Sequence, residues 1–112
     1  MEKEVSKASI ENRVAVIDCV TLWLTNFFTA HKNDIEKSLA DFKNELDVIE
    51  KMRGAFIIVS NEIGMGVHAE TEIGRKFTDL QGWANQYVTA KAGTVILMVS
   101  GIPVTIKNLV DA

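Results

Sequence analysis

The sequence is poor in the residues that mark special classes of protein. It contains one cysteine, Cys19, and one proline, Pro103. A lone cysteine cannot form a disulfide within the chain, and Cys19 lies in an apolar run, where we expect a small buried side chain in a reducing compartment. This composition excludes a small secreted domain held together by disulfides, and we expect a cytoplasmic protein.

Long hydrophobic runs and an excess of one charge are missing as well. No apolar run approaches the roughly 20 residues that cross a membrane, and residues 1–5 contain no apolar targeting core. The net charge of -3 gives no reason to expect nucleic acid or an anionic membrane as a partner, and it leaves room for a local basic pocket. The 112 residues suffice for one domain, with residues 1–12, which are charged and lack periodicity, as a mobile lead-in.

Short apolar runs alternate with amphipathic segments through the rest of the chain. Runs rich in β-branched residues predict buried strands at residues 13–19, 55–60 and 94–100, and a short fourth strand at 103–107. Helical spacing predicts helices at residues 20–30, from 35 to shortly before Gly54, and at 72–92. This alternation indicates an α/β fold with three layers: a mostly parallel sheet with helices on both faces.

The carboxyl ends of the strands are the expected ligand edge of such a sheet. Asp18 ends the first predicted strand, after Val-Ala-Val-Ile. This is the form of a Walker B strand, whose acid holds Mg²⁺ beside a nucleotide phosphate. An aspartate here equally suits a cap on the helix that begins at Val20. The sequence leaves both interpretations open.

The second strand is followed by a more specific pattern, Asn-Glu-Ile-Gly-Met-Gly at residues 61–66. Gly64 and Gly66 can adopt positive φ or let the backbone approach a ligand closely. The polar groups of Asn61 and Glu62 would then face that ligand. A tight strand-to-helix connection without a ligand is the alternative.

Two further features belong to the following loop and helix. Gly82 lies inside the predicted helix, where glycine costs about 1 kcal/mol relative to alanine, which favours a close approach of another group. His68 is either a candidate base or nucleophile or a plain polar loop residue. His31 has no chemical neighbours in sequence, and we assign it no role. Cysteine and histidine show no metal-ligand spacing.

Four stretches carry a resemblance to a known family. They are Asp-Cys-Val-Thr-Leu-Trp-Leu-Thr-Asn at 18–26, Val-Ser-Asn-Glu-Ile-Gly-Met-Gly at 59–66, Gly-Arg-Lys-Phe-Thr-Asp-Leu-Gln-Gly at 74–82 with Asn85 and Gln86, and Val-Ser-Gly-Ile-Pro at 99–103 with Lys107. Together they resemble the carboxyl-terminal part of the bifunctional adenosylcobinamide kinase / adenosylcobinamide-phosphate guanylyltransferase of cobalamin biosynthesis. The resemblance covers about residues 13–107.

This resemblance implies a P-loop NTPase-like fold and two reactions. A nucleoside triphosphate, GTP or ATP with Mg²⁺, phosphorylates the aminopropanol hydroxyl of adenosylcobinamide. GTP then donates GMP through a covalent guanylyl-histidine to form adenosylcobinamide-GDP. The implied partners are these nucleotides, a corrinoid and further copies of the chain in a homotrimer.

The resemblance also implies roles for individual residues. Asp18 would be a Mg²⁺ ligand, directly or through water. Asn61 and Glu62 would be the catalytic pair that orients the nucleotide or the substrate hydroxyl. The residues implied to contact the nucleotide or its phosphates are Gly64, Gly66, Arg75, Ser100 and Gly101.

The chain departs from the family at the phosphate loop. No Gly-x-x-x-x-Gly-Lys-[Ser/Thr] occurs, and neither His31 nor His68 has the position of the guanylylated histidine. Because the phosphate loop supplies much of the electrostatic stabilisation in phosphoryl transfer, we expect the chain alone to be inactive.

Without the strand that carries the loop, an apolar sheet edge should pair with another copy or with a missing amino-terminal half. Two alternatives to the enzyme stay open. One is a protein that binds nucleotide or corrinoid without turnover, and the other is an interaction module that completes another chain's sheet.

Overall fold

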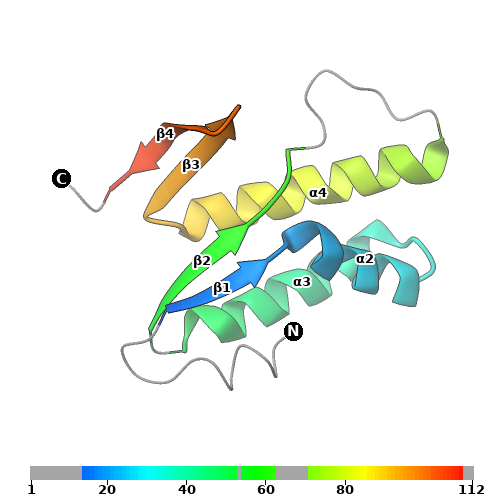
Figure 1. Ribbon diagram of the computed structural model, residues 1–112. Helices are drawn as coiled ribbons and strands as arrows, with labels where there is room; N and C mark the ends of the chain where they lie inside the picture. Colours follow the sequence, from blue (N-terminus) through cyan, green and yellow to red (C-terminus); the bar gives the residue numbers. More distant parts are fainter. Residues whose placement is uncertain (1–13, 53, 63–70, 110–112) are drawn as a thin grey trace.

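The computed structural model describes residues 14–52, 54–62 and 71–109 (Figure 1). Strands and helices alternate along the chain, which confirms the α/β class, and their boundaries differ from the predicted ones by only a few residues. None of the described helices combines the length and the apolar character needed to cross a membrane. The elements are β1 (Val14–Asp18), α2 (Val20–Ala30), α3 (Ile35–Glu50), β2 (Ala55–Val59), α4 (Glu72–Lys91), β3 (Thr94–Val99) and β4 (Ile102–Asn108).

Local hydrogen bonds determine where two of the helices begin. The Asp34 carboxylate accepts the backbone N–H of Lys37 at the start of α3, at 3.1 Å. The Thr71 hydroxyl oxygen accepts the N–H of Gly74 at the start of α4, at 2.9 Å. These side chains satisfy backbone donors that the first turn of a helix leaves unpaired. Gly54 has a φ of 109°, but it lies three residues beyond Lys51, the C-cap residue of α3. The expectation that Gly54 is the C′ residue of this helix is therefore wrong, and Gly54 directly precedes β2.

The described strands form two separate pairs rather than one mostly parallel sheet. β1 and β2 are parallel, with Val14 opposite Ala55 and Asp18 opposite Val59. β3 and β4 form an antiparallel hairpin. Its two turn residues, Ser100 and Gly101, both have positive φ, 51° and 80°, which matches the twist of a tight hairpin. The short fourth strand is therefore an antiparallel partner of the third.

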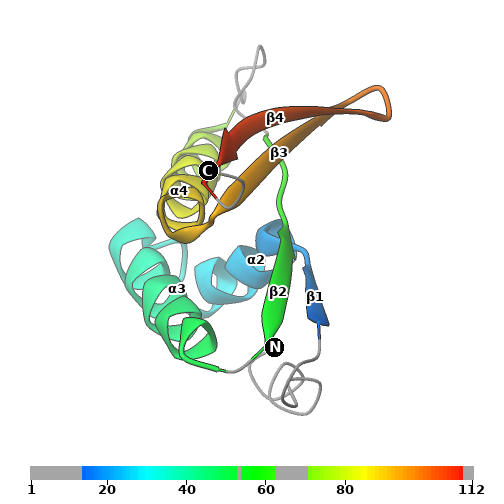
Figure 2. The same ribbon diagram turned by 90° about the vertical axis from the view of Figure 1, so that its left-hand side faces the viewer.

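The hydrophobic core lies between the β1–β2 pair and helices α2, α3 and α4, which all lie on one side of that pair (Figure 2). Trp23 and Phe42 pack edge to face, with ring centroids 4.7 Å apart, a geometry that aromatic rings favour. Cys19 is only partly buried. The buried core residues are Ile17, Val20, Trp23, Leu24, Phe28, Phe42, Leu46, Ile49, Leu80 and Ala84.

The opposite face of the β1–β2 pair is uncovered among the described residues. Val14 and Val16 are 60% and 62% exposed, whereas Ala15 and Ile17 between and after them are buried. Ile57 and Val59 of β2 are exposed on the same face. The expectation of helices on both faces is therefore not met in this part of the chain. The strands are apolar on both sides, and the described helices cover one of them.

We expect the 112-residue chain to self-associate at micromolar concentration. The uncovered face and the unpaired strand edges remain in water in a monomer, and burying such apolar surface is favourable. Sedimentation equilibrium measures the outcome. A single monomeric species that melts cooperatively would contradict it.

Candidate functional site at the ends of β1 and β2

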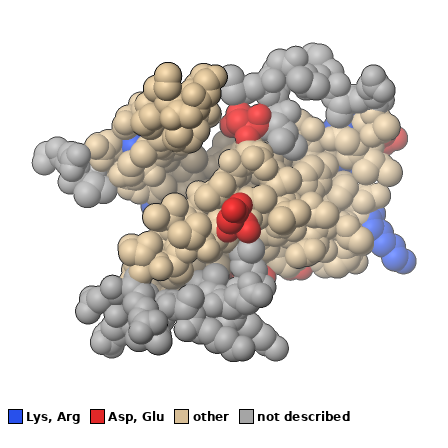
Figure 3. Space-filling model, in the orientation of Figure 1, with Lys and Arg blue, Asp and Glu red and all other residues tan. Residues whose placement is uncertain are grey.

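The carboxyl ends of β1 and β2 lie side by side, as the sequence predicts for a ligand edge. Asp18 is opposite Val59 in the parallel pairing, so Asn61 and Glu62 leave β2 just beyond Asp18. All three polar side chains belong to exposed residues. Figure 3 shows acidic atoms in two separate groups on this face of the molecule.

A buried glutamine on α4 connects this edge to the core. Gln81 is 1% exposed, and its amide makes three hydrogen bonds. Its Oε1 accepts the hydroxyl of Thr21 on α2 at 2.8 Å. Its Nε2 donates to Ser60 Oγ at 3.0 Å and to Asn85 Oδ1 at 3.1 Å. A buried amide needs such partners, because an unpaired one costs about 1–3 kcal/mol.

The hydrogen bonds close into a ring through Asn61. Its Nδ2 donates to Thr21 Oγ1 at 3.0 Å, and its backbone carbonyl accepts from Asn85 Nδ2 at 3.0 Å. Ser60 Oγ donates to Asn85 Oδ1 at 2.5 Å. We call Thr21, Ser60, Asn61, Gln81 and Asn85 the polar ring. It fixes the side chain and the carbonyl of Asn61, and thereby the direction in which the backbone leads to Glu62.

Asp18 does not cap helix α2. The N-cap residue is Cys19, whose side chain makes no capping hydrogen bond, so the capping alternative for Asp18 is wrong. Among the described residues, no group of three or more Asp, Glu, His or Cys side chains could hold a metal ion. An Mg²⁺ ion at Asp18 would therefore take its other ligands from phosphate oxygens and water, as this ion commonly does.

The other predicted site residues lie at other places along the chain. Arg75 is six residues before Gln81 on α4, which corresponds to about 9 Å along the helix axis. Ser100 and Gly101 form the turn of the hairpin, which projects away from the end of β2 in Figure 2. Gly64 and Gly66, like His68, lie outside the described residues, and their roles stay predictions.

Two interpretations of single residues change with the structure. Among the described residues, a Cβ atom added at Gly82 would meet nothing within 4 Å, so no described part of the chain approaches this glycine closely, and the approach of a ligand or another chain stays a prediction. His31, to which we assigned no role, has its Nε2 2.5 Å from Asp41 Oδ2. This contact joins the end of α2 to α3, and it is structural because it is remote from the strand ends.

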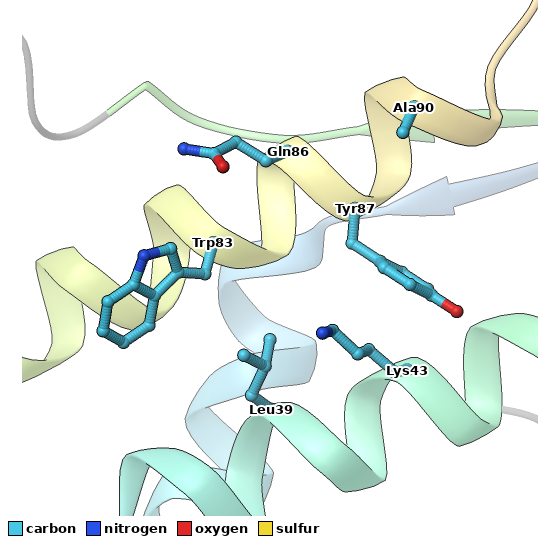
Figure 4. Close-up of a pocket in the computed structure, with 6 residues that line it drawn as sticks. All are labelled: Leu39, Lys43, Trp83, Gln86, Tyr87 and Ala90. Carbon is cyan, nitrogen blue, oxygen red and sulfur yellow. The ribbon is translucent and has the colours of Figure 1, made fainter.

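A surface hollow lies elsewhere, between α3 and α4 (Figure 4). It is an open groove of about 550 Å³ lined by Leu39, Lys43, Trp83, Gln86, Tyr87 and Ala90. It contains none of the predicted catalytic or metal-binding residues.

Charge pairs hold the two helices together beside this groove. The Tyr87 hydroxyl donates to Asp47 at 2.6 Å, which lowers the pKa of Asp47 and raises the pKa of Tyr87. Hydrogen bonding to Glu50 raises the pKa of Lys91, whose ammonium lies 4.9 Å from the Tyr87 ring centroid. We interpret the groove as part of a helix–helix interface, since Lys43 in its lining already has a partner, with its ammonium 5.0 Å from the Tyr87 ring centroid.

The family assignment follows from comparison with known proteins. The profile of the family "Cobinamide kinase / cobinamide phosphate guanyltransferase" matches residues 1–106. The chain belongs to this family. The residues of the polar ring and Asp18 all lie within the matched part.

Curated relatives agree with this assignment. "Bifunctional adenosylcobalamin biosynthesis protein CobP" of Pseudomonas aeruginosa is 33% identical over 96 residues. Proteins with the corresponding name CobU from Escherichia coli (strain K12) and Salmonella typhimurium (strain LT2) are 32% and 33% identical over 107 and 103 residues. These matches cover 82–86% of this chain. The chain spans little more than half of the relatives' length, 54%, 59% and 57% in this order.

Four members of the polar ring were not among the predicted site residues: Thr21, Ser60, Gln81 and Asn85. A signal for Gln81 is present in the sequence. Gln81 and Asn85 are four residues apart and directly follow Leu80 and Ala84, which are inward-facing core positions. Polar side chains at this spacing beside a buried stripe indicate a polar contact at the border of the core.

We expect Gln81→Leu to lower the free energy of unfolding by about 1–3 kcal/mol, because leucine fills the space but leaves buried polar partners unsatisfied. Gln86→Leu makes the same chemical change at an exposed position on the same helix, and its effect should stay within about 0.5 kcal/mol. Urea unfolding at one fixed protein concentration compares them. Equal effects of the two substitutions would contradict the structural role of the polar ring.

Proposed function

We propose that this chain forms one side of the nucleotide site in a cobinamide kinase and guanylyltransferase of cobalamin biosynthesis. The observation that carries the proposal is the polar ring, which holds Asn61 and Glu62 at the same sheet edge as Asp18 in a chain of this family. The proposed substrates are a corrinoid and GTP or ATP with Mg²⁺. The proposed compartment is the cytoplasm.

Each residue of this edge has a proposed task. The Asp18 carboxylate would hold Mg²⁺, and the bound ion would neutralise the negative charge of the nucleotide phosphates. The polar ring would keep the Asn61 amide and the adjoining backbone in one orientation. Glu62, exposed at the strand exit, would accept a hydrogen bond from the substrate hydroxyl and orient it towards the phosphate. Arg75 would neutralise phosphate charge, and Gly64, Gly66, Ser100 and Gly101 would border the nucleotide.

The chain by itself is proposed to be inactive. It has no Gly-Lys-[Ser/Thr] segment, which would donate backbone amides, a lysine and a Mg²⁺-binding hydroxyl to the phosphates. In the active assembly another polypeptide segment would supply these groups. The two strand pairs would then belong to a three-layer, mostly parallel sheet of the P-loop NTPase-like kind.

We expect the purified chain to transfer no phosphate from GTP or ATP to cobinamide and no GMP to cobinamide phosphate. A radiolabel assay with the nucleotide and Mg²⁺ measures both steps. Turnover by the chain alone would overturn the proposed inactivity. Calorimetric binding of GTP·Mg²⁺ and cobinamide without turnover, even after a phosphate-loop polypeptide is added, would favour the binding protein instead of the enzyme.

The uncovered face of the β1–β2 pair supports a second candidate function, that of an interaction module that completes another chain's sheet. In that case the polar ring is purely structural. The chain would co-purify with its partner, and neither nucleotide nor corrinoid would bind to the complex.

We expect Glu62→Gln to reduce turnover by about 100-fold or more in an assembly of this chain with a phosphate-loop polypeptide, a typical loss when a proton-accepting group is removed. The substitution keeps the shape of the side chain and removes its charge, so the melting temperature should not change. Glu72→Gln, at another exposed glutamate, is the matched control and should leave turnover within about twofold. Unchanged rates of both half-reactions in Glu62→Gln would contradict the proposed role.

A further inference from the structure

The hydrogen bonds of the polar ring run in one direction, and a single backbone atom determines that direction. The carbonyl oxygen of Asn61 can only accept a hydrogen bond. The side-chain atom of Asn85 that lies 3.0 Å from it must therefore be the nitrogen Nδ2. The oxygen of the same amide, Asn85 Oδ1, then lies towards Ser60 and Gln81. Because an amide oxygen cannot donate, both of these residues must donate to it.

The same reasoning fixes the orientation of the Gln81 amide. Its Nε2 donates to Asn85 Oδ1 and to Ser60 Oγ, at 3.1 and 3.0 Å. Ser60 Oγ is free to accept, because its own hydrogen is used for Asn85 Oδ1. Turning the Gln81 amide over would place its oxygen against Asn85 Oδ1 at a position that is 1% exposed, where water cannot separate the two atoms. Gln81 Oε1 therefore faces Thr21.

Thr21 transmits this direction to the candidate site. Its hydroxyl hydrogen is donated to Gln81 Oε1 at 2.8 Å, so Thr21 Oγ1 can only accept from its other neighbour. That neighbour is the side-chain amide of Asn61, whose Nδ2 lies 3.0 Å away. The other end of this amide, Asn61 Oδ1, makes no hydrogen bond within the described part of the chain. Asn61 is exposed, and this oxygen is therefore available to a ligand.

The side chains next to Asn61 at this edge are hydrogen-bond acceptors as well. Asp18 and Glu62 are exposed there, and a carboxylate offers only acceptor oxygens. A phosphate oxygen is also an acceptor, so neither the carboxylates nor Asn61 Oδ1 can donate to it. A hydroxyl, a carboxamide or the edge of a nucleobase carries the O–H or N–H that Asn61 Oδ1 can bind. The second hydrogen of Asn61 Nδ2 can donate to the same neutral group.

We propose that Asn61 binds a neutral hydrogen-bond donor of the substrate through Oδ1, and that Gln81 and Thr21 are positioning residues that turn this oxygen towards the ligand. The inference rests on the proposed function, in which Mg²⁺ at Asp18 holds the phosphates and Glu62 accepts one substrate hydroxyl. Asn61 then accepts from a second group. Its source is the nucleoside, through a ribose hydroxyl or a base N–H, or the corrinoid, through a carboxamide.

The first experiment determines the direction of the hydrogen bonds in the full chain without a ligand. We expect NMR to show nuclear Overhauser contacts from the Asn61 side-chain amide protons to the Thr21 methyl group, and from the Gln81 amide protons to the Hβ protons of Ser60. The Gln81 amide protons should exchange with water at least about tenfold more slowly than those of the exposed Asn44. Missing contacts together with equal exchange rates would overturn the fixed orientation.

The second experiment adds three probes separately to the full chain: guanosine, cobinamide and inorganic triphosphate with Mg²⁺. The first two carry neutral donors, and the third carries only phosphate oxygens. We expect the Asn61 side-chain amide signals to shift with guanosine or with cobinamide, and the one that shifts them identifies the source. A shift with triphosphate in place of both, or with none of the three, would overturn the proposed ligand.

Substitutions of Thr21 test its positioning role with the probe that shifts the Asn61 signals. Thr21→Val keeps the size of the side chain and removes the hydroxyl, so the Kd should rise by about 3- to 10-fold. Thr21→Ser keeps the hydroxyl and should restore the Kd to within about twofold. Thr25→Val is the matched control one helical turn further on, because the Thr25 hydroxyl bonds only to the Thr21 carbonyl, at 2.8 Å, and the Kd should not change.

Circular dichroism checks the folding of each variant, and Thr21→Ala replaces Thr21→Val if the latter unfolds. Equal Kd values for variants with and without the hydroxyl would overturn the positioning role. Phosphoryl transfer in an assembly with a phosphate-loop polypeptide, unaffected by Thr21→Val, would overturn this inference and keep the proposed function. A probe that shifts Asn61 and depends on the Thr21 hydroxyl, without transfer in that assembly, would support the inference and overturn the proposed kinase.

Discussion

Burial of helix α4 against α2, α3 and β2 is the constraint on which the rest of the structure depends. Leu80 and Ala84 of this helix are completely buried in the core cluster, and Gln81 beside them bonds to the start of α2 and to the end of β2. At its carboxyl end, the Lys107 ammonium donates to the backbone carbonyls of Thr89 and Ala90 at 2.9 and 3.4 Å. The helix thereby positions both strand pairs, although these pairs do not contact each other through hydrogen bonds in the described chain. A cation at this end also compensates the free carbonyls of the helix.

The polar ring shows how the core and the candidate site are coupled. Gln81 is buried with apolar neighbours, so its hydrogen bonds must all be made, and a partly satisfied network would be costly. The same bonds hold Asn61 at the strand exit, which is an exposed position. Rigidity at the site therefore comes from interactions inside the fold. Such support by surrounding side chains is what a binding group needs to keep one orientation.

In the described part of the chain, only one face of the β1–β2 pair is covered by helices. Helices α2, α3 and α4 bury one face of β1 and β2, and the valines and isoleucines of the other face remain exposed. Strands that are apolar on both faces are typical of parallel sheets covered by two layers. The strand sequences are thus those of a sheet that is covered on both faces, whereas the described helices cover one face. This difference is the reason for proposing that the chain works in a larger assembly.

Most of the local structure was predictable from the sequence. The period of the apolar residues located the helices and strands. The family motifs identified the end of β2 as the polar edge, and the comparisons confirmed the family. The antiparallel direction of β4 was missed, although Ser100 and Gly101 separate two apolar runs by only two residues, which is a hairpin signal.

The remaining features were decided by tertiary structure. The polar ring joins residues 21, 60, 61, 81 and 85, which come from three distant parts of the sequence, and no local pattern pairs Thr21 with Gln81. The open space around Gly82 among the described residues depends on where other elements pack, and its helix position alone does not determine it. A strand that is apolar on both faces has the same sequence pattern whichever of its faces the helices cover. The sequence by itself determined which segments become strands, helices and polar strand ends, because these depend on neighbouring residues. Only the tertiary structure decided which of them meet, because that depends on the packing of α4 against distant parts of the chain.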